Sequence, residues 1–420
     1  MKKKPLIILF TLLVCVVVIL CVSLFNNVSA KDLTKGLTPK KINNTIPDKS
    51  YINSYNNFSS NLFIASAENK GNVLISPASV YLALAMTVNG ADNETKTEML
   101  NALTSNGITL DMLNLQSSNL ISELKTSTDK TSLSVANSIW YDKEFTPDNA
   151  FLQTDADYYG AALNKLDFKD SKAGDVINKW VSDSTNGKID KIVDKIDEST
   201  VMYLINTIYF KSEWQSKFNK NNTRQMTFHT SAGGVEVDFL NKTGGVDYIS
   251  GNNAKGVVLN YENDKFAYFA IMPDNNATPR QWITSQGDKL FSNIFSMISA
   301  KQTKSADLYM PKFETKYQDS IKNELEKLGI NKAFDANSAD LSLMNKDHIK
   351  NLYISEVLHK TYIKIDENGT EAAAATSVEV SLTAMPSSDM QLKFDKPFIY
   401  GIVDLNSGSV IFAGIMENPS

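Results

Sequence analysis

Few side chains in this 420-residue chain could carry out catalysis. A Ser/His/Asp triad would have to use His229, His348 or His359, which are the only histidines, and none of them stands beside a G-x-S-x-G turn. The sequence contains no H-E-x-x-H motif, no glycine-rich phosphate loop and no C-x-x-C pair. Its 47 acidic residues make chance carboxylate pairs common. We therefore expect no catalytic residues, no metal site and no cofactor, and hence no enzyme.

The most informative residues lie near the C-terminus, where 366–386 reads DENGTEAAAATSVEVSLTAMP. From Thr370 onward, small or apolar side chains alternate with polar ones, as in a β-strand with two different faces. Four consecutive alanines would also suit a helix. The later alternation does not, because Val378, Val380 and Leu382 would not form one helical stripe. The segment is therefore expected to be able to form a strand, with side chains small enough to enter between two existing strands.

The run 366–376 resembles the hinge of the reactive centre loop of an inhibitory serpin, and the resemblance extends from about Tyr51 to Pro419. In chain order, the other motifs that carry it are Asn72 to Ser79, Asn206 with Tyr209-Phe210-Lys211 and Trp214, Leu308 to Phe313, His359-Lys360, and Phe394 with Pro397-Phe398 and Gly414. This resemblance implies an α+β serpin fold with three β-sheets (A, B and C), about nine helices and an exposed reactive centre loop at about 367–390.

The resemblance also implies roles for individual residues. On pattern alone His359 is a satisfied polar residue, Glu367 a surface charge and Trp214 a core aromatic. The resemblance instead implies three named groups of residues. The hinge of the loop consists of Glu367, Gly369, Thr370, Glu371, Ala372, Ala373, Ala374 and Ala375. The group called the shutter consists of Ser76, Ser79, Asn206 and His359, and the group called the breach consists of Trp214, Lys312 and Glu367.

By the same resemblance, a target protease cuts the loop, is held as an acyl-enzyme, and is trapped when the freed hinge enters sheet A as a new strand. Family spacing places the cut at Thr383–Ala384. Because the stretch onward to Phe394 is longer than in antitrypsin-like members, Leu382, Ala384 and Met385 remain alternatives for the residue before the bond. Met385 is a poor one, since Pro386 would follow the bond.

The composition of the loop indicates which proteases could cut it. No Lys or Arg lies between Gly369 and Gln391, so a trypsin-like pocket has nothing to bind. Small and aliphatic residues there suit elastase-like or subtilisin-like serine proteases, with papain-like cysteine proteases as a second target class. A non-inhibitory binding or chaperone-like role is the alternative from a different functional class.

The N-terminus predicts export. Lys2 to Lys4 precede an apolar run over 6–25 and the small-residue site Val28-Ser29-Ala30, as in a signal peptide spanning 1–30. The apolar run is also long enough for an outward-facing membrane anchor. Both cysteines lie in this leader, so the mature, secreted chain would have none. We expect a flexible spacer over 31–50 and one serpin domain over 51–420.

The net charge and the distribution of basic residues indicate which partners to expect. The net charge is −5 and no basic stripe interleaved with aromatic residues is present, so we expect no nucleic acid partner. The region 101–122, which corresponds to the heparin-binding helix of some serpins, contains no Lys or Arg, so heparin-type activation is not expected. The protein is expected to be a monomer.

Hydrophobic spacing predicts helices over 93–104, 116–125, 147–158, 172–185, 279–299 and 319–328. It predicts strands near 131–140, 161–168, 200–210, 226–240, 265–272 and 305–313. The irregular order of these elements favours an α+β fold.

Overall fold

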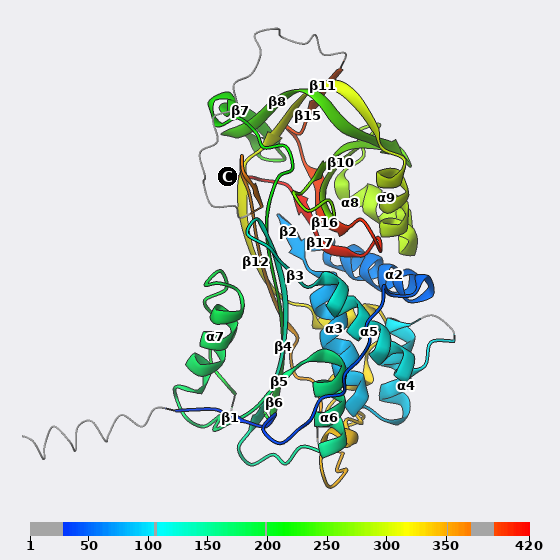
Figure 1. Cartoon of the computed structure of the whole chain (residues 1–420), viewed down its shortest axis with the longest axis vertical. Coiled ribbons are helices and arrows are strands. Elements are labelled where there is room, and N and C mark those ends of the chain that lie inside the picture. Colours follow the sequence, from blue (N-terminus) through cyan, green and yellow to red (C-terminus); the bar gives the residue numbers. More distant parts are fainter. Residues whose placement is uncertain (1–27, 105–106, 198–199, 351, 371–389) are drawn as a thin grey trace, which may run out of the picture.

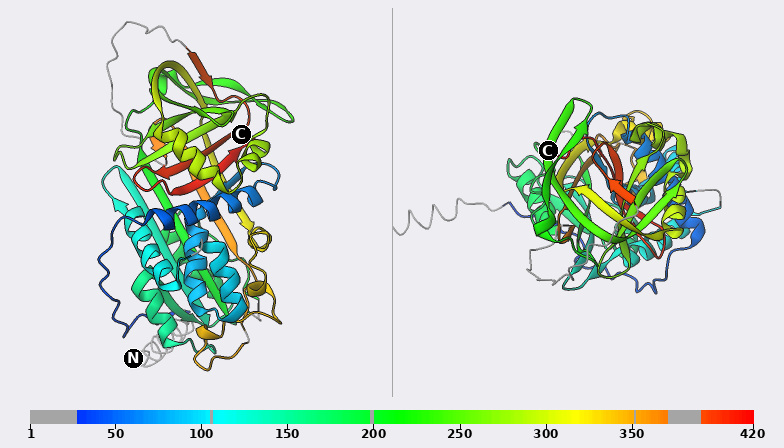
Figure 2. Two further views of the ribbon diagram at one scale, coloured as in Figure 1. Left: turned by 90° about the vertical axis from the view of Figure 1, so that its right-hand side faces the viewer. Right: turned by 90° about the horizontal axis from the view of Figure 1, so that it is seen from above.

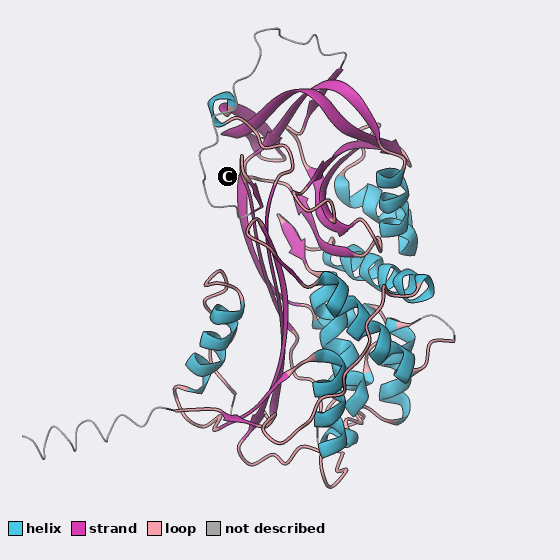
Figure 3. Cartoon of the chain, viewed as in Figure 1, coloured by secondary structure: helices cyan, strands magenta, loops and turns pink. Residues whose placement is uncertain are grey.

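A long sheet runs from one end of the molecule up to a second sheet at the other end, with helices on both faces of the long sheet (Figures 1 and 3). The computed structural model describes residues 28–104, 107–197, 200–350, 352–370 and 390–420. The strand order of this sheet, which corresponds to the expected sheet A, is β1 (Lys31–Asp32), β5 (Ala162–Leu166), β4 (Thr131–Asp142), β6 (Met202–Glu213), β14 (Gly369–Thr370), β13 (Leu358–Ile365) and β12 (Phe313–Ser320), and β3 (Thr126–Ser127) pairs with β4.

A second sheet occupies one end of the molecule (Figure 2). Its order is β15 (Met390–Lys393), β11 (Gln302–Pro311), β8 (Gly233–Gly251), β9 (Ala254–Asn260), β10 (Phe266–Pro273), β16 (Phe398–Asp404), β17 (Val410–Met416) and β2 (Val73–Ile75), and β7 (Arg224–Thr230) pairs with β8. The expected sheets B and C are joined here because the 19-residue strand β8 pairs with β7 and β11 and then continues to pair with β9. The fold expected from the sequence is confirmed in this architecture.

The long sheet separates two hydrophobic cores. One face is covered by α3 (Pro77–Thr87), α5 (Leu110–Leu124) and α6 (Asn149–Tyr159), with α4 (Asn93–Leu103) and α2 (Lys49–Ser66) beyond them (Figure 1). On the other face, α7 (Ala173–Ser184) is the one helix of the described residues, and it lies over a smaller core that includes Trp140, Ile177 and Ile205. Near the second sheet lie α8 (Pro279–Gln286) and α9 (Leu290–Ser299), and α10 (Lys322–Lys327) follows β12.

Local sequence explains where the helices begin. Ser76 caps α3 by accepting from the Ser79 backbone N–H, and Pro77 follows at the first helical position. Asp148 caps α6, and Thr278 with Gln281 forms a capping box on α8. The single helix expected over 279–299 is two, because Gly287 ends α8 before α9 begins.

The segment 31–50, expected to be a flexible spacer, instead lies along the body of the protein. Lys31 and Asp32 form β1 on the edge of β5. Further along, the backbone N–H of Lys40 donates to Asp157 on α6, and the N–H groups of Thr45 and Asp48 donate to Asn119 and Gln116 on α5. Polar side chains of the segment add to these contacts, because Asn44, Thr45 and Asp48 accept hydrogen bonds from Ser118, Asn119 and Gln116 on α5.

The expected leader falls almost entirely outside the described residues, which begin at Val28. Within the residues that the structure does describe, no helix is long and apolar enough to cross a membrane.

Candidate functional site

The candidate site is a slot in the long sheet between β6 and β13. These strands lie on either side of β14, which is two residues long. Beyond β14, no backbone pairing joins β6 to β13 in the described part of the chain, although each is fully paired on its other side. Since unpaired strand edges can accept another strand, the slot could hold one more.

Two of the predicted hinge residues, Gly369 and Thr370, already lie in this slot. Gly369 pairs with Glu213, and Thr370 pairs with Ser212 on β6 and with Ile365 on β13. The expectation of a loop exposed from about residue 367 is therefore wrong at Glu367 and Thr370, which are buried. The reason is local: Thr370 is buried and its hydroxyl hydrogen bonds to that of Tyr261.

Gly369 is required where it stands. Its φ is +155°, and a Cβ there would collide with the backbone carbonyl of Ser212. A glycine therefore allows the chain to turn in between β6 and β13.

The three predicted breach residues meet at the top of the slot. The indole N–H of Trp214 donates to the Asp366 carbonyl at 2.8 Å, and its ring stacks on Tyr261 at 4.7 Å. The carboxylate of Glu367 lies 3.1 Å from Lys312 Nζ and accepts from the Thr223 hydroxyl at 2.9 Å. Burial opposes ionisation of Glu367, but hydrogen bonds from its own backbone, from Lys312 and from Thr223 hold its pKa below the usual value.

The four predicted shutter residues also lie together, further along the slot. His359 Nε2 accepts from the Ser76 backbone N–H at 3.1 Å. The Ser76 hydroxyl donates to the Ile411 carbonyl at 2.9 Å, and the Ser79 hydroxyl donates to the Asn206 carbonyl at 3.2 Å. The network thus links α3, β6, β13 and β17.

Asn137, which the sequence analysis missed, extends this network. It accepts from the side-chain amide of Asn206 and donates to the Tyr159 carbonyl at 3.0 Å. It sits on β4 directly opposite Asn206. No local pattern marks Asn137, because the pairing of β4 with β6 alone brings the two amides together.

The imidazole of His359 is neutral. Burial lowers its pKa from 6.5 to about 4. Because Nε2 accepts a hydrogen bond, the ring proton must be on Nδ1. The shutter is therefore held by a histidine that acidification would charge.

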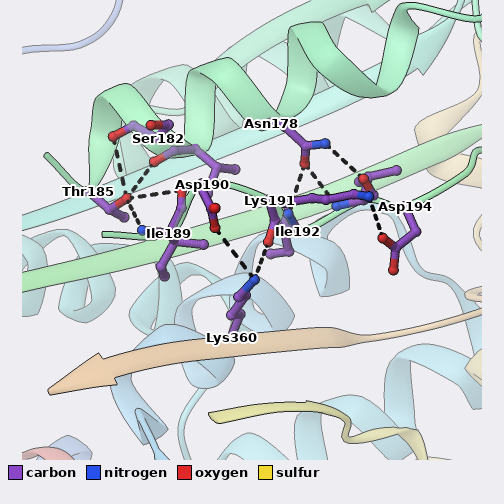
Figure 4. Close-up of polar contacts among 11 residues, drawn as sticks. Asn178, Ser182, Thr185, Ile189, Asp190, Lys191, Ile192, Asp194 and Lys360 are labelled. Carbon is purple, nitrogen blue, oxygen red and sulfur yellow. Dashed lines mark hydrogen bonds and ion pairs between the residues drawn. The ribbon is translucent and has the colours of Figure 1, made fainter. Parts of the chain in front are cut away.

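A strap of residues 189–194, between α7 and β6, lies beside the lower part of the slot (Figure 4). It is bound to α7 through Asn178, whose side chain accepts from the N–H groups of Ile192 and Val193 at 2.8 and 2.9 Å and donates to the Val193 carbonyl at 2.8 Å. Lys360 on β13 donates to the Lys191 carbonyl at 2.6 Å. The strap therefore joins α7 to the far side of the slot.

A small apolar cavity lies at the lower end of the slot. It has a volume of about 50 Å³ and its lining includes Ile192, Val193, Met202, Leu204 and Val357. The strap, β6 and the residues leading into β13 thus enclose space that the described residues leave unfilled.

The remaining predicted residues lie outside the described chain. They are Glu371, Ala372, Ala373, Ala374 and Ala375 of the hinge and Thr383 and Ala384 of the expected scissile bond. The described residues hold no group of three or more His, Cys, Asp or Glu side chains that could bind a metal ion.

Comparison with known proteins gives concordant matches. The family described as Serpin (serine protease inhibitor) matches residues 53–419. Alpha-1-antiproteinase of Rattus norvegicus is 31% identical over 358 residues, which cover 84% of this chain and 84% of the relative. The native-state crystal structure of tengpin, a thermophilic serpin, superposes with a TM-score of 0.86 and 38% identity, covering 93% of this chain and 100% of that one. Human thyroxine-binding globulin superposes with a TM-score of 0.79 and 25% identity, covering 89% and 100%.

Proposed function

The chain belongs to the serpin family, and we propose that it is a suicide-substrate inhibitor that traps serine proteases by inserting its cleaved loop between β6 and β13. Serpins are in general protease inhibitors and not enzymes, and relatives of this chain carry inhibitor names. The observation that carries the proposal is that Thr370 already occupies the first position of a slot that the described residues otherwise leave without a strand.

The ladder started by β14 gives the register of the remaining loop. Thr370 pairs with Ser212 and with Ile365, so each later loop residue would face one position earlier on β6 and one earlier on β13. Thr370 points into the larger core, toward Tyr261. Alternate residues 372, 374, 376, 378 and 380 would therefore point there as well.

Loop side chains match the slot position by position in this register. Ala372 would lie between Phe210 and Ile363, and Ala374 between Ile208 and Thr361, so alanines fall where the neighbours are bulky or branched. Small residues are needed there because a packed interior tolerates little extra volume.

At the next positions, the polarity and size of the loop side chains change in step with those of the residues that line the slot. Thr376 would lie between Asn206 and His359, where the network is polar. Val378 would reach Leu204 and Val357, which line the unfilled cavity. Polar side chains thus meet polar ones, and larger apolar side chains meet the empty space.

We assign elastase-like or subtilisin-like proteases as targets because the loop lacks basic residues and offers small or aliphatic ones. Family spacing puts the cut at Thr383–Ala384, with Leu382, Ala384 and Met385 as alternatives for the residue before the bond. Papain-like cysteine proteases are a second target class. The predicted leader would place the inhibitor outside the cell, where such proteases act.

A second candidate is a non-inhibitory ligand carrier, favoured by the likeness to thyroxine-binding globulin, which has been solved with thyroxine bound. The small side chains of the hinge, Ala372 to Ala375, favour insertion and hence the inhibitor.

The test is to mix the protein with pancreatic elastase or subtilisin and to look for an SDS-stable covalent adduct. Mass spectrometry of the released C-terminal peptide identifies the cut, which we expect to leave a new N-terminus at Ala384. Turnover as an ordinary substrate by every serine and cysteine protease tried would favour the carrier. Trypsin is the matched negative control.

A further inference from the structure

Two lysines flank the slot at the first position beyond β14. Thr370 pairs with Ser212 and with Ile365. The next position of the same ladder therefore lies between Lys211 on β6 and Lys364 on β13. We call these two residues the lysine pair.

Both lysines point to the α7 face of the sheet. Their neighbours Ser212 and Ile365 are fully buried, and the Ser212 hydroxyl hydrogen bonds to that of Thr131 at 2.6 Å. Because side chains alternate along a strand, Lys211 and Lys364 lie on the opposite face, where both are partly exposed.

The charge of the lysine pair is poorly compensated. Among the described residues, Lys211 makes no ion pair, and the closest carboxylate to Lys364 Nζ is that of Asp366 at 3.5 Å. Glu314 is directly across from Lys364 on β12, but on the side away from the slot. The slot thus carries two cations facing each other at the point where insertion would continue.

We propose that the lysine pair is an acceptor that binds the carboxylate of Glu371 and thereby draws the loop into its first new position. This proposal rests on the proposed inhibition by loop insertion. Glu371 follows Thr370 directly, so strand alternation would place its side chain on the α7 face between the two cations. An anion there replaces repulsion across the slot by two attractions.

This attraction is confined to the first step. On the same face, Ala373 would lie between Tyr209 and Tyr362, and Ala375 between Thr207 and Lys360. Neither alanine carries a charge. The lysine pair therefore acts where the ladder is extended first and not along its whole length.

Early insertion matters because it competes with hydrolysis of the acyl-enzyme. A slower first step releases more protease as free enzyme and more inhibitor as cleaved product. The lysine pair should thus affect how many inhibitor molecules are consumed per protease trapped, and not the rate of loop cleavage.

The experiment uses the full chain and subtilisin. The test variants are Glu371→Gln, Lys211→Gln and Lys364→Gln. The control variant is Lys316→Gln. Lys316 is on β12 and on the same face of the sheet as the lysine pair, but it pairs with Tyr362 and does not border the slot. We expect each of the first three variants to raise the number of inhibitors consumed per trapped protease by ~3- to 10-fold at low salt, and the difference to shrink in 1 M NaCl. Lys316→Gln should behave as the wild type.

Charge reversal gives a second readout. Glu371→Lys alone should impair trapping strongly, and combining it with Lys211→Glu and Lys364→Glu should restore it. Wild-type trapping by all three neutralised variants, or an equal loss in Lys316→Gln, would overturn the acceptor while leaving the inhibitor assignment intact. If the wild type forms no adduct and its cleaved form is no more heat-stable than the intact one, the inhibitor assignment itself fails, and the acceptor with it.

Discussion

At the scale of single residues, His359 makes the shutter sensitive to pH. It is buried and neutral, with Nε2 accepting from the Ser76 backbone. The pKa of this histidine is about 4 in the folded chain against 6.5 when unperturbed. Below pH 6.5 the His359 imidazole binds a proton in the unfolded chain but not in the folded chain. Stability from this group is therefore full above 6.5 and is lost as the pH falls toward 4.

We expect the intact protein to lose about 2 kcal/mol of unfolding free energy between pH 7 and pH 5 through this histidine, and about 3 kcal/mol by pH 4. Urea unfolding followed by circular dichroism measures it. His359→Gln should flatten the dependence in this window, whereas His229→Gln, an exposed residue on β7, should not. An equal pH slope in the wild type and in His359→Gln would contradict the assignment.

Thr370 gives a sharper test of insertion. Thr370→Arg places a cation where the side chain is buried against Tyr261, so the hinge cannot remain in or enter the slot. We expect proteases to cut this variant at a normal rate without forming an SDS-stable adduct.

Thr370→Val is the matched control for this substitution. It removes the hydroxyl but keeps the volume, and it should still trap. Adduct formation by Thr370→Arg would show that the hinge need not pass this position.

The residues of the site were more predictable from sequence than their contacts. Trp214, Lys312 and Glu367, which were grouped from the family resemblance, lie close together in the structure, and their role stays a prediction. Asn137 and the lysine pair had no local signal, because only the register between distant strands brings them to the slot.

At the scale of elements, the strap is held mainly by one amide. Asn178 on α7 makes three hydrogen bonds to Ile192 and Val193. Thr185 adds a second hold by accepting from the Ile189 N–H at 3.1 Å (Figure 4). The strap is therefore hydrogen-bonded to α7 at two points, through Asn178 and through Thr185.

Asn178→Ala should lower the unfolding free energy by about 3 kcal/mol, because it leaves buried backbone groups of the strap unpaired. Chemical denaturation measures the loss. The control is Lys179→Ala, at the residue next to Asn178 on the same helix, which removes an exposed ion pair with Asp183. It should change the unfolding free energy by less than about 0.5 kcal/mol. Similar losses in the two variants would mean that Asn178 does not anchor the strap.

Elements with one clear hydrophobic period were predicted well, and those divided by short turns were not. The strand β4 and the helix α7 lie close to the expected 131–140 and 172–185. The strand expected over 226–240 is a hairpin of β7 and β8. The strand β12 was not expected, and it lies between the strand expected at 305–313 and the helix expected at 319–328. Turns of two residues or fewer interrupt these strands without changing the alternation that was used to detect them.

At the scale of the whole molecule, the intact protein should be less stable than its cleaved form. Insertion of about a dozen residues, at ~1 kcal/mol for each net hydrogen bond, is on the order of 10 kcal/mol. With an unfolding entropy of about 2.1 cal/mol/K per residue, the melting temperature should rise by roughly 10–15 °C.

Calorimetry before and after cutting of the loop measures this rise. The cleaved Thr370→Arg variant is the control and should show little gain, because its hinge stays outside the sheet. Equal melting temperatures for intact and cleaved wild type would mean that no strand is added.

The packing of the N-terminal segment has a consequence for the predicted cleavage of a leader after Ala30. Val28 and Ala30 pack against the smaller core, and Lys31 begins β1. A signal peptidase that cuts after Ala30 must draw this stretch, extended, into its own active site. In the folded chain, Val28 and Ala30 instead pack against the smaller core. If the predicted leader is a signal peptide, its removal would therefore have to come before folding, and a molecule that folded first would keep it.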